Sequence, residues 1–289
     1  MERGFLSNAE LRTPAGRLFY GISVLFLIVV AIVALFPFVF AFTSGLKGST
    51  EIFSSGLNLF PEVPLWKNYA DAWRNFNMPR LFQNSFFIVT VAVALRLIVS
   101  SCAAYSLSQL KPLGGRYIST GFMLTLMVPG IAYFVPLYVT IGNLPILHWN
   151  LIDSYWGLWL PGCMDAFGIF VLKTFFDSIP SEIIDSAKVD GASAIQIFWR
   201  IVLPLSRSIF IVLVVLSFVG IWKDFLLPML VITDPARQPI TVRLFYLANN
   251  YGVNLQMAAS FMALLPPLLI AIVLQRYMQL GVSLGSVKG

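Results

Sequence analysis

Polar residues that could do chemistry fall into two groups in this largely apolar sequence. The first group is the polar segment, residues 178–205, which lies between two very apolar stretches. A charge near the centre of a membrane helix costs about 2.5–3.5 kcal/mol on insertion scales, so charged residues inside apolar stretches need a partner or a polar pathway. The second group consists of such residues and an adjacent indole: Arg96, Asp165, Trp222, Lys223 and Asp224.

Neither group has the spacing of a catalytic site. The sequence contains no His-Glu-x-x-His motif, and the absence of a Gly-Lys dipeptide excludes a phosphate-binding P-loop of the Walker type. His148 is the only histidine and has no cysteine or carboxylate cluster at ligand spacing, and the two cysteines lie in apolar stretches. We therefore expect no catalytic residue, metal site or cofactor in this chain.

The composition indicates an integral membrane protein. Of 289 residues, 58% are hydrophobic and 11% are charged, and the mean hydropathy is +0.83. A soluble domain is about one quarter charged, so folding alone does not hide this much apolar surface from water. The net charge of +6 is better explained by basic membrane loops than by nucleic-acid binding.

The apolar runs predict an all-α integral membrane fold with six transmembrane helices. The first helix, 18–42, follows a tail at 1–17, and a core transmembrane domain at 79–276 precedes a tail at 277–289. The core is expected to hold spans at about 81–107, 118–141, 155–176, 209–232 and 256–275. We expect Pro129 and Pro136 to kink or interrupt the third span.

Basic residues set the expected orientation. Eleven Lys and Arg residues fall in the segments that this topology places inside, and six fall in those placed outside. Both termini and the polar segment are then cytoplasmic, and the loop at 233–254 is well placed outside to meet a partner.

The polar segment is typical of a helix–turn–helix at a membrane surface. Pro180 suits the first turn of a helix at 182–189, and Gly191 suits the left-handed turn that ends it. Ser193 and Gln196 have the capping-box spacing and start a second helix. We expect apolar side chains available for a partner on one face of each helix: Ile183, Ile184 and Ala187 on the first, and Ile195, Phe198, Trp199 and Val202 on the second.

The run Asp185-Ser186-Ala187-Lys188-Val189-Asp190-Gly191-Ala192, followed by Phe198 and Leu203-Pro204, resembles the coupling-loop motif of ABC-importer permeases. Asp185 stands where that family usually has Glu, and Ser186 where it usually has Ala. Further short runs resemble the carbohydrate branch of the family, and the last residues, 285–289, are similar to the C-terminus of the maltose-type six-span subunit. Those runs are Asn84-Ser85, residues 103–107, Pro136-Leu137-Tyr138, residues 155–158, Leu160-Pro161, residues 222–225 and residues 264–268.

This resemblance implies a type I importer permease fold in the bacterial cytoplasmic membrane. It implies a second, homologous permease subunit, two ABC ATPase subunits that bind ATP and magnesium, and an extracytoplasmic solute-binding protein. It also implies carbohydrate as the substrate, alternating access, and a cytoplasmic coupling loop that grips the ATPase. The candidate ATPase-coupling residues are Asp185, Ser186, Ala187, Asp190, Gly191, Ala192, Phe198, Leu203 and Pro204.

Some of these residues have expected roles. Gly191 would set the bend, Phe198 would be an apolar anchor, and Asp185 and Asp190 would cap or pair across the joint. The residues of the second group are candidates for the translocation pathway, and Lys223 stands where the family usually has Asn. We expect Lys223 and Asp224 to reach water at the outer boundary.

Alternatives remain at this point. Arg96 and Asp165 are expected to face the bundle interior and to pair with each other, with a partner subunit or with polar substrate. An ABC permease for another solute, such as glycerol phosphate or an anionic saccharide, is the first alternative function. A secondary transporter or channel is a weaker one, because it has no reason to carry the coupling motif, and a membrane enzyme is weaker still.

Overall fold

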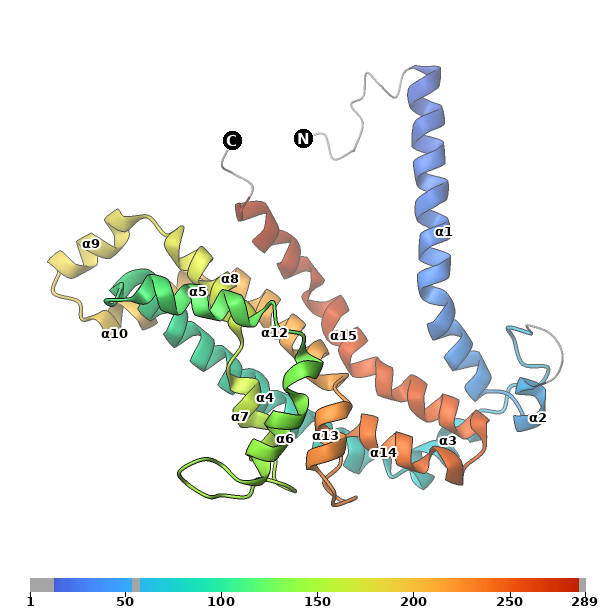
Figure 1. The fold of residues 1–289 in the computed structure, drawn as a ribbon. Helices are drawn as coiled ribbons and strands as arrows, with labels where there is room; N and C mark the ends of the chain where they lie inside the picture. The colour runs from blue at the N-terminus through green and yellow to red at the C-terminus, as the bar shows by residue number, and fades with distance from the viewer. Residues whose placement is uncertain (1–12, 54–57, 286–289) are drawn as a thin grey trace. The chain divides into compact units, whose positions relative to one another are not determined.

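All regular secondary structure in the part of the chain that the structure describes is helical (Figure 1). The computed structural model describes residues 13–53 and 58–285, with side chains described as far as residue 275. A helical backbone satisfies its own N–H and C=O groups, which is what a chain surrounded by lipid must do. The all-α class predicted from composition is confirmed.

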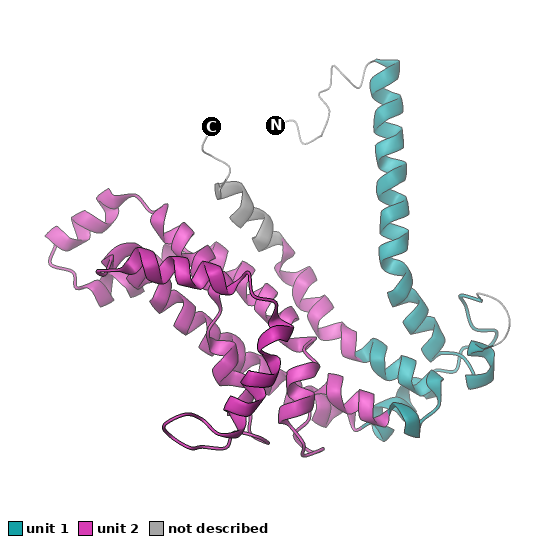
Figure 2. Cartoon of the chain, in the orientation of Figure 1, with its two compact units in different colours: residues 1–76, 248–262 teal, residues 77–247, 263–289 magenta. Residues whose placement is uncertain are grey.

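The chain divides into two compact units (Figure 2). Unit 1 comprises residues 1–76 and 248–262, and unit 2 comprises 77–247 and 263–289. The helices of unit 1 are α1 (Pro14–Gly45), α2 (Ser49–Ile52), α3 (Lys67–Asn75), the 3-10 turn η5 (Ala248–Asn250) and the first part of α15 (Val253–Gly285). Those of unit 2 are α4 (Met78–Tyr105), the π turn η2 (Ser106–Leu110), α5 (Gly115–Thr125), the 3-10 turn η3 (Gly130–Tyr133), α6 (Phe134–Gly142), α7 (Trp156–Cys163), α8 (Ala166–Asp177), α9 (Ser181–Val189), α10 (Ala194–Ile197), the π turn η4 (Phe198–Val202), α11 (Leu203–Leu205), α12 (Arg207–Trp222), α13 (Leu226–Val231), α14 (Ile240–Leu247) and the rest of α15.

In unit 1, side chains of α3 hold the end of α1. Asn68 Nδ2 donates to the carbonyl oxygens of Gly45 (3.0 Å) and Lys47 (2.9 Å), and the Tyr69 hydroxyl donates to the carbonyl of Phe42 (2.9 Å). The last carbonyls of a helix have no intrahelical donor, so these bonds satisfy groups that would otherwise need water. Burial raises the pKa of Tyr69 well above its usual range, which keeps this hydroxyl a donor.

Three helices are each long and apolar enough to cross a membrane: 14–45, 78–110 and 253–275. Three bent pairs also qualify when each is taken as one span, with bends of 99° between 115–125 and 130–142, 40° between 156–163 and 166–177, and 76° between 194–205 and 207–222. The most apolar window of α1 has none of its residues buried inside the chain. So large an exposed apolar surface requires lipid or a partner protein to cover it.

Two of the predicted spans are interrupted, and the residues at each interruption explain why the helix stops there. α5 ends at Thr125 and Pro129 caps η3, so the chain turns there, whereas Pro136 lies in the first turn of α6, where a missing N–H costs little. In the predicted span at 209–232, α12 ends at Trp222 and α13 begins at Leu226. Charged residues therefore occupy a gap in the helix rather than a helical turn.

α4 is the element around which unit 2 packs. It contacts α7, α8, α12 and α14, and its residue Ile88 accepts a hydrogen bond through its carbonyl oxygen from Trp159 Nε1 of α7 (3.1 Å). Ile88 belongs to a buried cluster with Ile141, Leu158 and Val231. A second buried cluster lies at the other end of α4, around Tyr105. The two ends of unit 2 thus have separate cores joined by one long helix (Figure 1).

The surroundings of Gly157 indicate how tightly the cluster around Ile88 is packed. A Cβ at this position would lie 2.7 Å from the carbonyl oxygen of Leu151, 2.8 Å from Val231 Cγ1 and 3.1 Å from Ile141 Cγ2. We expect Gly157→Ala to destabilise the protein by about 1–3 kcal/mol, because backbone as well as side chains must move. A lower melting temperature in detergent would be the measured result.

Gly121→Ala is the matched control for this prediction. A Cβ at Gly121, within α5, meets nothing within 4 Å. Alanine there should be neutral, or stabilising by up to about 1 kcal/mol, since it is the better helix former. Equal melting temperatures for the two variants would show that the α7 contact is looser than the geometry indicates.

Candidate functional site

The first half of the polar segment ends in a Schellman turn. After α9, Asp190 is the C-cap, Gly191 has φ +81°, the N–H of Gly191 donates to Lys188 O (3.0 Å) and that of Ala192 donates to Ala187 O (2.9 Å). Gly191 is therefore the residue that sets the bend, since only glycine adopts this conformation without steric cost. Pro180 lies just before α9 as its N-cap, one position ahead of the first turn where the sequence predicted it.

The second half begins with the predicted capping box and ends at a proline. The N–H of Gln196 donates to Ser193 Oγ (3.3 Å), and the N–H of Ser193 donates to Gln196 Oε1 (2.8 Å). The helix then widens into the π turn η4 before Leu203 and Pro204 form α11. Proline has no N–H and crowds the preceding turn, and a π turn is a common way to relieve that crowding.

One face of the polar segment is buried against the helices of unit 2. Ile184, Ala187, Ile197, Phe198 and Val202 pack in one cluster with residues of three other helices: Ala104 and Tyr105 of α4, Leu172 and Phe176 of α8, and Leu213 of α12. Burying a side chain such as Phe contributes about 1.5–3 kcal/mol. The cluster therefore holds the segment to the ends of the apolar helices.

Phe198 is an anchor inside this chain rather than toward a partner. It is 7% exposed, and its ring lies 4.9 Å from that of Tyr105. The Tyr105 hydroxyl in turn donates to the carbonyl oxygen of Ala194 at the start of α10 (2.9 Å). The sequence placed Ile184, Ala187, Phe198 and Val202 among the side chains available to a partner, and for these four that expectation was wrong because they are buried in this cluster.

The exposed side of the segment carries four apolar side chains among polar ones such as Glu182 and Lys188. Val189, Ile195 and Trp199 are 87%, 72% and 63% exposed, and Ile183 is exposed as well. Ile183 thus points away from Ile184 and Ala187, with which the helical pattern had grouped it. The face that remains for a partner is these four side chains, which we call the outer face (Ile183, Val189, Ile195 and Trp199).

The acidic residues of the segment do not join its two helices. Asp185 Oδ1 accepts a hydrogen bond from Lys188 Nζ (2.9 Å) within α9, and both side chains are mostly exposed. An exposed pair of this kind is worth little, about 0–1 kcal/mol. The Ser186 hydroxyl donates to Ile183 O (3.1 Å), also within α9, so the joint depends on Gly191 and the buried cluster.

A polar contact that the sequence analysis missed fixes the base of the segment. Ser108 Oγ donates to Asp177 Oδ1 (2.6 Å), and Gln109 Nε2 donates to the carbonyl oxygen of Phe176 (2.9 Å). Lys173 Nζ is 2.6 Å from Asp177 Oδ2. The bonds of Ser108 and Gln109 tie the end of α8 to η2, but their partners are far apart in the sequence and no local pattern signals them.

Four of the five pathway candidates line one cavity of about 460 Å³ in unit 2: Arg96, Asp165, Trp222 and Asp224. Arg96 Nε donates to the carbonyl oxygen of Gly162 (2.9 Å) at the end of α7. Among the described residues, no ion pair joins Arg96 to Asp165, so the version of the hypothesis in which they pair with each other is wrong. Asp165 instead lies at the break between α7 and α8, as the N-cap of α8.

The fifth candidate, Lys223, is exposed in a neighbouring open pocket that also contains Arg96 and Asp224. Trp222 Nε1 donates to the carbonyl oxygen of Ala263 (3.1 Å), which leaves the buried indole ring as an apolar wall of the cavity. Carboxylates, a guanidinium and an indole around one cavity can hydrogen-bond and stack on a polar solute. In the part of the chain that is described, no three His, Cys, Asp or Glu residues gather as a metal site.

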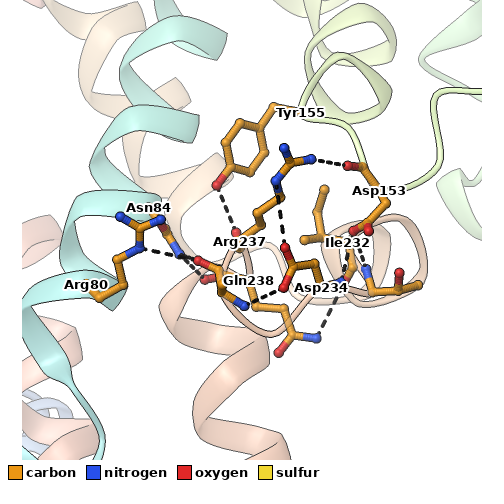
Figure 3. Close-up of polar contacts among 10 residues, drawn as sticks. Arg80, Asn84, Asp153, Tyr155, Ile232, Asp234, Arg237 and Gln238 are labelled. Carbon is orange, nitrogen blue, oxygen red and sulfur yellow. Dashed lines mark hydrogen bonds and ion pairs between the residues drawn. The ribbon is translucent and has the colours of Figure 1, made fainter.

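At the other end of unit 2, the loop at 232–238 is held by two neighbouring segments (Figure 3). Asp153 Oδ1 accepts from the backbone N–H groups of Thr233 (3.0 Å) and Asp234 (2.9 Å), and Arg237 Nη1 donates to the Asp153 carbonyl (2.7 Å). Asn84 Nδ2 donates to the carbonyl oxygens of Ala236 (2.9 Å) and Gln238 (3.0 Å). The segment around Asp153 thus meets the loop at 232–238, at the end of α4 opposite the polar segment.

The comparisons with known proteins agree with this architecture. Residues 97–283 match the family described as binding-protein-dependent transport system inner membrane component. The sn-glycerol-3-phosphate transport system permease protein UgpE of Yersinia pestis is 31% identical over 262 residues, covering 87% of this chain and 91% of that protein. The diacetylchitobiose uptake system permease protein NgcG of Streptomyces coelicolor is 29% identical over 286 residues, covering 97% and 93%.

A solved structure is similar along nearly the whole chain. It is described as a bacterial ABC transporter involved in the import of the acidic polysaccharide alginate, and it matches with a TM-score of 0.79 at 20% identity. The match covers 95% of this chain and 99% of that one. The type I importer permease fold expected from the resemblance is confirmed.

The Schellman turn gives a prediction about local order. We expect Gly191→Ala to destabilise the turn by about 1–2 kcal/mol, the cost of a left-handed conformation for a residue with a Cβ. The amides of Gly191 and Ala192 would then exchange with deuterium about five times faster or more. Hydrogen exchange of the purified protein, followed over residues 181–197, measures this directly.

Gly191→Asn is the matched control, because asparagine tolerates the left-handed region better than alanine. A Cβ at this position meets nothing within 4 Å, so any difference between the two variants comes from the backbone and not from a clash. Unchanged protection in the alanine variant would mean that the turn does not depend on its positive φ.

Proposed function

Because the chain belongs to the family of binding-protein-dependent transport system inner membrane components, we propose that it is a permease subunit of an ATP-driven carbohydrate importer. It would carry the solute across the bacterial cytoplasmic membrane by alternating access. A second, homologous permease subunit would complete the pathway, and two ATPase subunits would bind ATP and magnesium. This chain would have no catalytic role in the hydrolysis.

The observation that carries the proposal is the two-faced packing of the polar segment. Its inner face is anchored on α4, α8 and α12, and its outer face presents apolar side chains to a partner. A force applied to the outer face would therefore reach the membrane helices through a rigid, buried contact. Alternating access needs such a connection, because it moves helices as bodies in response to differential binding by a partner.

A neutral saccharide is the solute that the cavity favours. Carboxylates accept hydrogen bonds from sugar hydroxyls, Arg96 donates them, and Trp222 offers a flat apolar ring. NgcG is described as a diacetylchitobiose permease, which supports the carbohydrate class. An anionic solute is the second candidate, supported by Arg96 and by the glycerol phosphate relative, but Asp165 and Asp224 oppose it in the same cavity.

The loop at 232–238 is the proposed docking region for a solute-binding protein outside the membrane. Its backbone is held by Asp153 and Asn84, so its exposed groups are in fixed positions before a partner arrives. Orderly loops lose less conformational entropy on binding than mobile ones do. With this orientation, both chain termini and the polar segment would be cytoplasmic.

The outer face can be tested by placing a charge on it. We expect Val189→Asp to lower ATP hydrolysis stimulated by the binding protein at least tenfold, since a carboxylate buried without a partner costs several kcal/mol. The measurement uses the complete importer in proteoliposomes, together with a check that the variant assembles. Unchanged stimulation in an assembled complex would exclude the outer face as the site of ATPase coupling.

Val63→Asp is the matched control, since it makes the same substitution at an exposed valine in unit 1, which is not part of the polar segment. This variant should retain full stimulation. A loss in both variants would indicate a general effect of surface charge rather than a break in coupling.

The cavity can be tested through Asp165. If this carboxylate contacts the solute, Asp165→Asn should lower uptake about tenfold while assembly and basal ATP hydrolysis are retained, because a hydrogen bond to a charged acceptor is worth about 1.5–3 kcal/mol. Uptake of radiolabelled solute in proteoliposomes measures the effect. Normal uptake by the variant would exclude contact between Asp165 and the solute.

A further inference from the structure

A shallow cavity of about 520 Å³ lies in unit 2 beside the base of the polar segment, and it shares no residue with the cavity lined by Arg96 and Asp165. It is formed by η2, the loop at 111–114, α5 and α8. Its polar lining consists of three cationic side chains, three hydroxyls and one carboxylate: Lys111, Arg116, Lys173, Ser108, Ser119, Thr120 and Asp177.

The charges of this cavity do not balance. Lys173 is paired with Asp177, whose other oxygen accepts from Ser108. Lys111 and Arg116 have no acidic partner among the described residues, and both are exposed. Three cations against one carboxylate leave two positive charges facing the same hollow. The cavity therefore favours an anion with more than one acceptor oxygen.

Exposed apolar residues adjoin the two unpaired cations in the sequence, outside the lining of the cavity itself. Leu113 is fully exposed, Tyr117 is 83% exposed, and Leu110 and Ile118 are exposed beside them. Leucine and tyrosine next to lysine and arginine are typical of the boundary between headgroups and acyl chains, where each kind of side chain meets its own solvent. A soluble anion would use the cations alone and would leave this apolar rim in water.

We propose that this cavity binds the phosphate group of an anionic phospholipid at the membrane surface. Lys111 and Arg116 would contact the phosphate oxygens, and the apolar rim formed by Leu110, Leu113, Tyr117 and Ile118 would lie against the first part of the acyl chains. The cavity borders the Ser108–Asp177 contact, which fixes the base of the polar segment, so the lipid would brace the end of α8 where that segment begins.

Binding can be measured on the purified importer by native mass spectrometry, titrated with phosphatidylglycerol or with phosphatidylcholine. We expect phosphatidylglycerol to bind preferentially. The double variant Lys111→Gln/Arg116→Gln should bind it about thirtyfold more weakly, since each basic residue near an anionic membrane is worth about 1 kcal/mol. Binding of phosphatidylcholine should not change. The single variant Lys111→Arg keeps both positive charges, so it should retain most of the affinity for phosphatidylglycerol.

Lys67→Gln/Arg74→Gln is the matched control, because it removes one lysine and one arginine from exposed positions of α3 in unit 1. It should leave lipid binding unchanged. Equal loss in the control, or undiminished phosphatidylglycerol binding in the cavity variant, would overturn the proposal.

Two further outcomes would also overturn the lipid proposal, because each would show that something other than a phospholipid occupies the cavity. Inorganic phosphate that competes with phosphatidylglycerol at equal concentration would identify a site for a free anion. If the importer carrying the double variant dissociates into subunits in detergent without lipid, acidic groups of a neighbouring subunit cover the two cations. Neither outcome bears on the proposed transport function, which is measured by uptake.

Discussion

Phe198, Tyr105 and Phe176 meet where the polar segment joins the ends of α4 and α8, and this contact determines how the rest of unit 2 can work. The segment is too short and too polar to be held by lipid. Its inner face must therefore be buried against helices of the same chain, and the hydrogen bond from Tyr105 to Ala194 fixes its position along α4. The side chains of the outer face stay exposed, so another protein could contact them without disturbing the buried inner face.

The two polar ends of unit 2 are held by different kinds of interaction. At the end with the polar segment, a buried apolar cluster holds the segment against the helices, and the hydrogen bond from Ser108 to Asp177 fixes the end of α8 against η2. At the opposite end, the loop at 232–238 is held mostly by backbone groups bonded to Asp153 and Asn84. A buried hydrophobic cluster resists separation of the helices that it joins, whereas a hydrogen-bonded loop keeps a fixed backbone conformation. The two ends are thus suited to different tasks.

Between them, the breaks at 164–165 and 223–225 create the cavity. A continuous helix would use its backbone groups internally and keep its charged side chains apart, but an interrupted helix exposes carbonyls such as that of Gly162 to a nearby Arg96. Irregular backbone at membrane depth is tolerated where it lines a cavity or is covered by protein. Asp165, Lys223 and Asp224 are therefore found at the breaks for a physical reason, whereas Arg96 lies within α4 and bonds to a carbonyl that one break exposes.

The sequence by itself determined the features that depend on composition or on neighbours along the chain. Its hydropathy indicated an all-helical membrane protein, Gly191 predicted the turn, and Ser193 with Gln196 predicted the cap. Tertiary structure alone decided which face of the polar segment is buried, so that Ile184 turns inward while Ile183 turns out. It also gave Arg96 a carbonyl partner and joined Asp153 to Thr233. Those outcomes depend on side chains that are distant in sequence, and helical periodicity carries no information about what will cover them.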